Sequence, residues 1–363
     1  MRYVDEYRQK ILISRIAGRI RSAIPSRQIN IMEVCGTHTQ NFFRFGLDKF
    51  LPSNIRLISG PGCPVCVSEQ AYIDSAIYIA RQKDALLLTF GDMLRVPGTR
   101  SDLGEERASS GNIRVLYSPL DSIKVAKAHP DKRVVFLAVG FETTVPTIAL
   151  SILAAQKEKI KNIFFLCALK LIPAAMEHLS CDKRLKLDGF LCPGHVSSII
   201  GTKPYEFIPK RYGLNCCVAG FEPLDILEGI YILVTQLTKG KPSVANQYIR
   251  AVKRQGNPRA QSIIKRVFQV DDASWRGLGK IPKSGLVLRK EFFRFSAEKE
   301  FKIPRYAHPS AGSVKCRCAD ILKGLVSPDK CPLFAHRCTP DTPVGPCMVS
   351  HEGACNAYFK YRK

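Results

Sequence analysis

The stretch "RVVFLAVGFETT", residues 133–144, places a continuous apolar run directly before a glycine loop. The next residues, "VPTIALSILAAQKEK" (145–159), carry apolar side chains at helical spacing. Glu142 and Pro146 interrupt the apolar stretch, so it predicts a strand, a loop and a helix instead of a membrane span. A strand that passes through a glycine loop into a helix is typical of an α/β fold with a mostly parallel sheet.

The same rhythm extends in both directions from this stretch. Apolar runs that end in glycine or proline loops predict strands, and helical patterns follow them at 68–83, 172–179 and 224–237. In parallel sheets, sites form in the loops at the carboxyl ends of strands. The further predicted strands are "INIMEV" (29–34), "IRLISG" (55–60), "ALLLTFGDM" (85–93), "NIFFLCAL" (162–169), "GFLCPGHVS" (189–197) and "NCCVAGFEP" (215–223).

Two loops share the letters GFE, at Gly140 and at Gly220, and each follows a predicted strand. This echo is either chance or a sign of equivalent loops in two related units. After Gly240 the strand–helix rhythm weakens and leads into a loop-rich, cysteine-rich tail. Helical stretches are expected at 244–253 and 259–269 and within the first 30 residues, where Ile11, Leu12, Ile16, Ile20 and Ile24 have helical spacing.

The composition is globular, with 45% hydrophobic and 24% charged residues, and the formal net charge is +24. Between Arg250 and Arg305 the chain carries 15 basic and 5 acidic residues. Such a surface attracts nucleic acid, a membrane or an acidic protein. No zinc-finger, helix-turn-helix or RNP pattern accompanies the charge, and no secretion signal or membrane span is visible. A solvated basic face with no dedicated ligand is the alternative. We expect a cytoplasmic protein that binds neither nucleic acid nor membrane.

Fourteen cysteines are many for 363 residues. A cytoplasm keeps thiols reduced, so clustered cysteines indicate metal binding or redox chemistry in place of disulfides. The scattered cysteines are expected to be buried and inert, and they are Cys167, Cys181, Cys192, Cys216 and Cys217.

The first cysteine group is "GPGCPVC", residues 60–66, between a predicted strand and a predicted helix. Cys63 and Cys66 are thus expected near a helix N-terminus, which favours thiolate and suits reversible thiol–disulfide exchange. Half of a zinc site is the first alternative, although no nearby second pair supplies the missing ligands. A tight turn with two buried thiols is the other.

"MEVCGTHTQ" (32–40) adds Cys35, with Thr37 and His38 close behind it at another predicted strand end. Cysteine and histidine together can ligate a metal, or the histidine can activate the thiol. A purely structural histidine is the alternative. Three further residues are weaker candidates from glycine-containing loops: Glu142, His195 and Glu222. The acidic residue of a GFE loop could simply cap the next helix.

The tail contains six cysteines within 40 residues, at positions 316, 318, 331, 338, 347 and 355. Cys316, Cys331, Cys338 and Cys355 have the spacing C-x14-C-x6-C-x16-C. Prolines and glycines dominate between them, so the segment needs something to hold it together. Four thiolates around an iron–sulfur cluster would do so. Zinc is the alternative metal.

Taken together, nine ordered segments resemble the HypD family, the iron–sulfur scaffold proteins of [NiFe]-hydrogenase maturation. The resemblance runs from Met32 to Tyr361 and departs from the family only in connecting residues. The segments are "EVCGTHT" (33–39), "GPGCPVC" (60–66), "TFGDMLRVPG" (89–98), "GFETTVPT" (140–147), "LCPGHVSSIIG" (191–201), "AGFEPLDIL" (219–227), "NQYIRAV" (246–252), "WRGLGKIPKSGL" (275–286) and "CPLF…CTPDTPVGPCMVSHEGAC" (331–355).

The resemblance implies two similar parallel-sheet α/β domains, which agrees with the GFE echo, and we expect them at 55–132 and 133–222. The third domain, made of 1–54 with 223–363, is then expected to be helical, with a cysteine-rich tail that holds an iron–sulfur cluster.

The resemblance also implies a role in assembling the Fe(CN)2CO group of the hydrogenase active site. It implies that Cys35 holds the iron, with His38 close by, and that Cys63 and Cys66 form a redox pair. It also implies four ligands for a [4Fe–4S] cluster, namely Cys316, Cys331, Cys338 and Cys355, while Cys318 and Cys347 match family cysteines that are not ligands. The implied partners are a HypC-type chaperone and HypE, which donates cyanide supplied by HypF; the hydrogenase large subunit is reached indirectly. Because these partners are proteins, the basic charge is expected to serve protein docking.

Two other classes of function stay open. One is a free-standing oxidoreductase that passes electrons through a cluster and a dithiol, as ferredoxin–thioredoxin reductases do. Such a reductase needs no third cysteine beside a histidine, whereas an iron scaffold does, so "EVCGTHT" separates the two. The other class is a basic nucleic-acid binder, which leaves all three cysteine groups unexplained.

Overall fold

A computed structural model describes residues 5–304 and 316–362. Within this range the strands form two sheets. Sheet 1 has five parallel strands in the order β2-β1-β7-β8-β9. Its strands are β1 (Ile29–Glu33), β2 (Ile55–Ser59), β7 (Gly189–Pro193), β8 (Asn215–Ala219) and β9 (Val244–Asn246).

Sheet 2 has six strands in the order β10-β11-β6-β5-β3-β4. Its strands are β3 (Ala85–Thr89), β4 (Ile113–Val115), β5 (Arg133–Gly140), β6 (Ile163–Lys170), β10 (Phe268–Trp275) and β11 (Gly279–Leu288). Strands β3 to β6 are parallel, and the β10–β11 hairpin adds to the β6 edge in antiparallel sense. The predicted α/β fold with two mostly parallel sheets is confirmed.

Strand β5 shows why this fold forms. Val134 and Phe136 pack into the cluster that holds α5 (Asp121–Ala128) and α6 (Val145–Lys157). Val135 and Leu137 pack into the cluster that holds α3 (Gln70–Ala80). Successive side chains of a strand point to opposite faces, so a strand covered by helices on both faces needs an unbroken apolar sequence.

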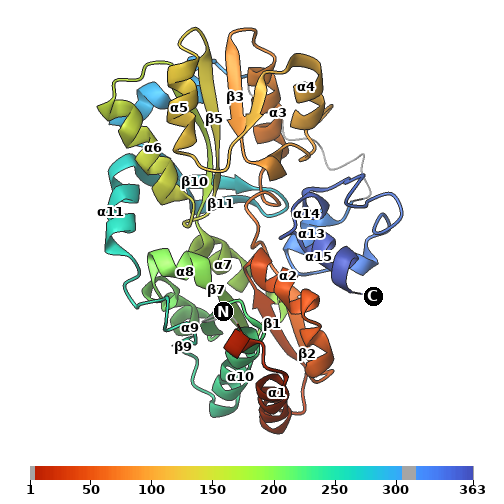
Figure 1. The fold of residues 1–363 in the computed structure, drawn as a ribbon. Helices are drawn as coiled ribbons and strands as arrows, with labels where there is room; N and C mark the ends of the chain where they lie inside the picture. Colours follow the sequence, from red (N-terminus) through yellow and green to blue (C-terminus); the bar gives the residue numbers. More distant parts are fainter. Residues whose placement is uncertain (1–4, 305–315, 363) are drawn as a thin grey trace.

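Helices cover both sheets. In Figure 1, sheet 2 lies above sheet 1. On sheet 1, α1 (Lys10–Ala23) packs along α10 (Pro223–Lys239), which lies on β7 and β8. The remaining α-helices described before the tail are α2 (Gly36–Arg44), α4 (Leu103–Ser110), α7 (Ile172–Ser180), α8 (Gly194–Ile200), α9 (Phe207–Tyr212), α11 (Pro258–Val267) and α12 (Ala297–Glu300).

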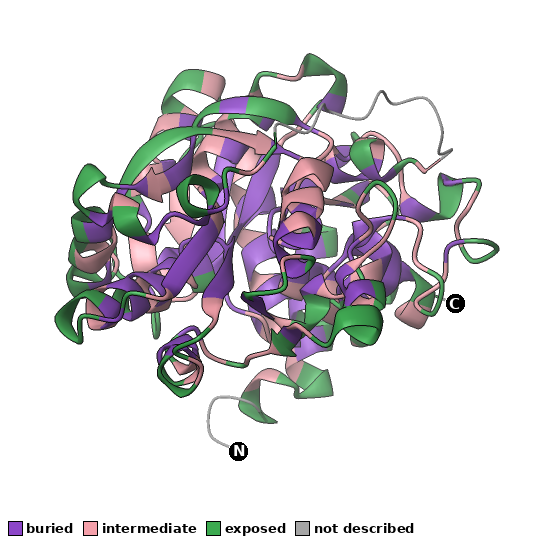
Figure 2. Cartoon of the chain, turned by 90° about the horizontal axis from the view of Figure 1, so that it is seen from above, coloured by how far each residue is buried: buried purple, intermediate pink, exposed green. Residues whose placement is uncertain are grey.

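The C-terminal tail forms loops and three short helices beside the junction of the two halves (Figure 1). These helices are α13 (Cys318–Leu322), α14 (Pro346–Val349) and α15 (Ala354–Tyr361). One apolar cluster contains side chains from sheet 1, sheet 2 and the tail together. The buried strands and the exposed outer surfaces of the helices are separated clearly in Figure 2. The tail is therefore built into a core that it shares with both sheets.

The two sheets group the strands differently from the expected domain ranges. Residues 55–132 contribute β2 to sheet 1 but β3 and β4 to sheet 2, and 133–222 is divided in the same way. The chain crosses between the sheets three times: after β2, after β6 and after β9. The GFE loops nevertheless occupy similar places, because Gly140 ends β5 before α6 and Gly220 follows β8 before α10. Strand order in the sequence does not reveal which strands pair.

Two local expectations after Gly240 are corrected. The expected helix at 244–253 is wrong, because its first residues form β9, paired with β8 through Cys216 and Val244. The helix expected at 259–269 is confirmed as α11, but it ends at Val267 and β10 begins at Phe268. The β10–β11 hairpin was not anticipated. Pairing with an existing sheet edge overrides weak local propensity here.

Within the described ranges, no helix is long and apolar enough to cross a membrane. Arg305, the last residue of the basic segment, lies outside the described residues.

Candidate functional site

Four loops meet at the carboxyl end of sheet 1, where the parallel arrangement predicts a site. Cys35 is the N-cap residue of α2, just after β1. "GPGCPVC" follows β2, His195 lies in α8 after β7, and Phe221 follows β8. Four stretches that are far apart in the sequence thus place their candidate residues at one edge of one sheet.

The "GPGCPVC" loop lies directly against Cys35. The backbone N–H of Gly36 donates to the carbonyl oxygen of Gly62 at 3.0 Å. A Cβ atom on Gly62 would lie 2.3 Å from the backbone nitrogen of Cys35, which is far inside van der Waals contact. Glycine is needed at this position because the two backbones are so close.

Substituting Gly62 with alanine is expected to separate the two thiol loops. The added methyl group has only rigid backbone to push against, so unfolding should be easier by about 1–3 kcal/mol, the usual cost of overpacking. Chemical denaturation of the purified protein measures this. Gly111→Ala is a poor control because Gly111 has positive φ, whereas Gly18→Ala, which meets nothing within 4 Å, is a suitable one. Equal stability of the Gly62 and Gly18 variants would contradict the expectation.

The Cys35 thiol is buried and only 8% exposed. Burial, followed by the nearby Glu352 carboxylate, raises the pKa of Cys35 to about 12. Without a bound cation the group is therefore a protonated thiol. A soft metal ion would displace that proton, since thiolate is the form that binds metal.

The His38 imidazole does not act on Cys35 in the expected way. Its Nε2 lies 2.9 Å from the carbonyl oxygen of Gly220 and therefore donates to it. Burial lowers the pKa of His38 to about 4, so the ring is neutral, and Nδ1 is buried without a hydrogen-bond partner among the described residues. The contact with Cys35 comes from the backbone, where the His38 N–H donates to the Cys35 carbonyl at 3.0 Å. His38 ties α2 to the loop after β8.

The tail reaches Cys35 through Glu352, a residue that sequence reasoning missed. The Thr37 hydroxyl donates to Glu352 Oε1 at 2.6 Å. A Cβ atom on Gly36 would lie 2.3 Å from the carbonyl oxygen of Glu352. The only available signal was its place in "HEGAC", three residues before Cys355. Thr37 thus connects the Cys35 loop to the tail.

Cys63 and Cys66 lie in a turn, and α3 begins only at Gln70, so the expected helix N-terminal placement is not observed. A local hydrogen bond takes its place. The backbone N–H of Cys66 donates to Cys63 Sγ at 3.3 Å. Burial raises the pKa of the Cys66 thiol well above its ordinary value.

Cys66 also touches the tail. Its Sγ donates to the carbonyl oxygen of Pro346 at 3.7 Å. The Cys347 thiol interacts with the thiols of Cys66, Cys318 and Cys355. The sulfur atoms of Cys318 and Cys347 are 2.8 Å apart. A continuous series of thiols therefore leads from "GPGCPVC" into the tail, and Cys347 is the residue that connects them.

All six tail cysteines line one small cavity, together with apolar side chains. The lining residues are Cys316, Cys318, Ile321, Cys331, Phe334, Cys338, Gly345, Cys347, Met348 and Cys355. In the part of the chain that is described, no three Cys, His, Asp or Glu side chains converge closely enough to hold a single metal ion. Six sulfur donors around one apolar cavity are the ligand type that both iron–sulfur clusters and zinc take.

The other candidates have separate places. Glu222 is the N-cap residue of α10 and pairs with the Arg8 guanidinium at 3.0 Å, in agreement with the capping alternative. The His195 ring stacks on Phe221 with 3.9 Å between centroids, and Phe221 also contacts His38. Glu142 belongs to the other sheet, where its Oε1 accepts from the N–H of Ile172 at the start of α7. Burial raises the pKa of Glu142 to about 8.

The scattered cysteines follow the expectation with exceptions. Cys192, Cys216 and Cys217 are fully buried. Cys167 is half-buried. Cys181 is exposed, because it lies at the end of α7, where its thiol contacts the Tyr212 hydroxyl at 3.6 Å.

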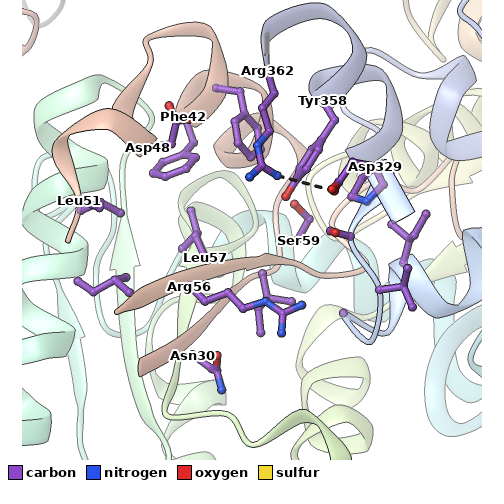
Figure 3. A pocket seen from close by; sticks show the side chains of 18 of the residues that line it. Asn30, Phe42, Asp48, Leu51, Arg56, Leu57, Ser59, Asp329, Tyr358 and Arg362 are labelled. Carbon is purple, nitrogen blue, oxygen red and sulfur yellow. Dashed lines mark ion pairs between the residues drawn. The ribbon is translucent and has the colours of Figure 1, made fainter. Parts of the chain in front are cut away.

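A larger cavity of about 830 Å³ lies on the surface between β2 and the tail. Figure 3 shows its lining, which includes Arg56 and Leu57 on one side and Tyr358 on the other. Arg362 and Asp329 form an ion pair across 3.8 Å within it. No cysteine lines this groove, so volume alone does not locate the thiol site.

Comparison with known proteins identifies the family to which this chain is similar. A family model described as "HypD: Hydrogenase formation hypA family" matches residues 10–362. The chain is 46% identical to the hydrogenase expression/formation protein HupD of Azotobacter chroococcum, covering 99% of this chain and 97% of that protein. It is 43% identical to the hydrogenase maturation factor HypD of Cupriavidus necator, covering 99% and 97%.

The hydrogenase maturation factor HypD of Escherichia coli is 42% identical, over 100% of this chain and 99% of that protein. The match therefore includes all three cysteine groups and the sheet edge on which two of them lie. With a family model across nearly the whole chain and full-length relatives above 40% identity, the chain belongs to the HypD family of hydrogenase maturation factors.

Proposed function

We propose that this maturation factor is the scaffold and redox protein on which the Fe(CN)2CO group of a [NiFe]-hydrogenase is assembled. In this proposal the iron is the cargo and Cys35 holds it. Cys63 and Cys66 form a dithiol relay, and the tail holds a [4Fe–4S] cluster. The observation that carries the proposal is the convergence of three cysteine groups: Gly36 bonds to Gly62, and Thr37 bonds to Glu352.

The placement of Cys35 suits a bound iron cargo. Low-spin iron with cyanide and carbon monoxide favours a soft, electron-rich thiolate. The thiol lies in a buried site, where exclusion of water protects a reactive metal complex. Cys35 stands outside the thiol series of the tail, so the cargo and the electron source do not compete for the same sulfur.

The tail cavity suits a resident cluster. Cys316, Cys331, Cys338 and Cys355 would hold it, as the family spacing implies. When bound, such a cluster supplies or accepts electrons one at a time. Cys318 and Cys347 line the same cavity but do not ligate the cluster in this proposal, and Ile321, Phe334 and Met348 shield the sulfurs from water.

The relay is a thiol–disulfide exchange between protein sulfurs. When Cys63 and Cys66 pass two protons and two electrons to the iron site, where attachment of the diatomic ligands consumes electrons, one S–S bond forms between them. Cys347 is placed to attack that disulfide at Cys66, since the two thiols interact. Attack would form a Cys66–Cys347 bond and release Cys63 as a thiolate. Cys318 then attacks Cys347, 2.8 Å away, and releases Cys66, so that the disulfide moves to Cys318 and Cys347.

Oxidation of anaerobic protein is expected to remove two free thiols in the first instance, at Cys63 and Cys66. Alkylation with a mass-labelled maleimide before and after mild oxidation, followed by peptide mass spectrometry, measures this. Cys192→Ser is a matched control, because Cys192 is buried but lies outside the series. Equal alkylation of Cys63, Cys66, Cys318 and Cys347 in both samples would rule out the relay.

As a maturation factor, the chain is involved with other maturation proteins. We propose that its partners are a HypC-type chaperone and HypE, with HypF upstream and the hydrogenase large subunit reached indirectly. We propose a cytoplasmic location, and that the basic surface serves protein docking and not nucleic acid.

The infrared spectrum of protein purified with its chaperone tests the function. Cyanide and carbon monoxide stretching bands that travel with the protein are expected. A free-standing oxidoreductase of the ferredoxin–thioredoxin reductase type would show the thiol chemistry without these bands. The contact between Cys35 and the "GPGCPVC" loop favours the scaffold, because a reductase has no use for a third buried thiol there.

A further inference from the structure

The turn between β10 and β11 is inserted between the two thiol segments. The backbone N–H of Arg276 donates to the carbonyl oxygen of Val67, the residue after Cys66, at 2.9 Å. A Cβ atom on Gly277 would lie 2.8 Å from the Cα of Ala319, the residue after Cys318. Two adjacent residues of one turn thus fix the distance between the dithiol loop and the tail.

The Arg276 side chain brings a positive charge to this place. Its Nη2 donates to the carbonyl oxygen of Pro97 at 3.1 Å, and no described carboxylate lies within ion-pair distance of it. Asp74, the carboxylate that acts on it electrostatically, is bonded to the backbone N–H and hydroxyl of Thr99 at 2.7 and 2.6 Å. The guanidinium charge is therefore not neutralised locally.

The positive charge of Arg276 acts on sulfur atoms of the tail. Arg276 interacts electrostatically with Cys316, Cys318 and Cys347. Burial lowers the pKa of the Arg276 guanidinium, but an arginine side chain keeps its charge in proteins. The loop whose Pro97 carbonyl accepts from Arg276 also contacts the tail, because Arg95 Nη2 donates to the carbonyl oxygen of Asp341 at 2.8 Å. A partly buried cation acts more strongly on its neighbours than an exposed one, because less water screens it.

We propose that Arg276 is a positioning residue that tunes the thiol site: its guanidinium stabilises negative charge on the tail sulfurs and raises the reduction potential of the cluster that they hold. The proposal rests on the proposed function, since it requires that cluster. Four thiolates give a [4Fe–4S] group a net negative charge, and reduction adds one electron without breaking a bond. A fixed cation nearby therefore favours the reduced state.

The test compares the cluster midpoint potential in Arg276→Gln, Arg276→Lys and the unmodified protein, by dithionite titration followed by electron paramagnetic resonance. In Arg276→Gln, the ratio of reduced to oxidised cluster at a fixed potential should fall about tenfold, which equals a shift of about 59 mV to more negative values for one electron. Arg276→Lys keeps the charge and should restore most of the potential.

Arg317→Gln is the matched control. Arg317 stands between Cys316 and Cys318 in the sequence, but its side chain is 45% exposed and pairs with Asp320 at 3.0 Å. Removing this screened charge should shift the potential less than Arg276→Gln does. Equal potentials in Arg276→Gln and the unmodified protein would overturn the inference, as would equal shifts in the Gln and Lys variants. Absence of iron from the unmodified protein would instead refute the proposed function.

Discussion

Replacing Cys35 with alanine is expected to abolish the cyanide and carbon monoxide bands in the infrared spectrum and to stop hydrogenase maturation. The tail should keep its brown colour. The physical reason is that Cys35 is the one thiol at the sheet edge outside the relay and the tail cavity. Without its sulfur, the iron cargo loses the thiolate that binds it. Infrared spectroscopy and iron analysis of protein purified with the chaperone measure both parts.

The control is Cys217→Ala. Cys217 is another buried thiol of sheet 1, and burial also raises its pKa to about 12, but it packs in the core beneath α10. Its loss should leave the bands in place, which separates the chemistry of Cys35 from the general cost of removing a buried sulfur. His38→Ala should weaken the bands less than Cys35→Ala does. Bands that persist in Cys35→Ala would contradict the assignment of Cys35 and favour Cys63 or Cys66 as the iron ligand.

Changing Cys331 or Cys338 to alanine is expected to remove the brown chromophore and to destabilise the tail. Both residues line the cavity, and the loops between them contain little regular structure of their own. The binding energy of a metal group that requires the folded site contributes directly to the stability of that fold. Visible absorption, iron and sulfide content, and limited proteolysis of anaerobic protein measure the result.

Cys318→Ala is the internal control for the ligand set, because Cys318 lines the same cavity without belonging to the expected four. That variant should retain the colour and lose only the last step of the thiol exchange. Anaerobic protein with zinc and no iron in the tail would show that the cluster assignment is wrong. Loss of colour in Cys318→Ala with retention in Cys331→Ala would show that the ligands are misassigned.

Much of the fold was predictable because its signals are local. The apolar run of 133–140, its glycine loop and the helix behind it are continuous in the sequence, and β5 and α6 form there. The prediction failed where the signal was weak: Val244–Asn246 became a strand only because β8 offered an edge. The turn at Arg276 was also missed. The β10–β11 hairpin is antiparallel, so it lacks the strand–helix alternation by which the parallel strands were recognised.

The sequence by itself determined the α/β class, the three cysteine groups and their spacing, since periodicity and spacing are properties of neighbouring residues. Tertiary structure alone decided that β1 pairs with β7 and that Cys66 meets the backbone of Pro346, 280 residues away. It also decided that Glu352 accepts a hydrogen bond from Thr37 and that the His38 ring donates to the Gly220 carbonyl instead of bonding to Cys35. Such contacts follow from how the apolar faces of two sheets and the tail are buried together in one core, and no short segment carries that information.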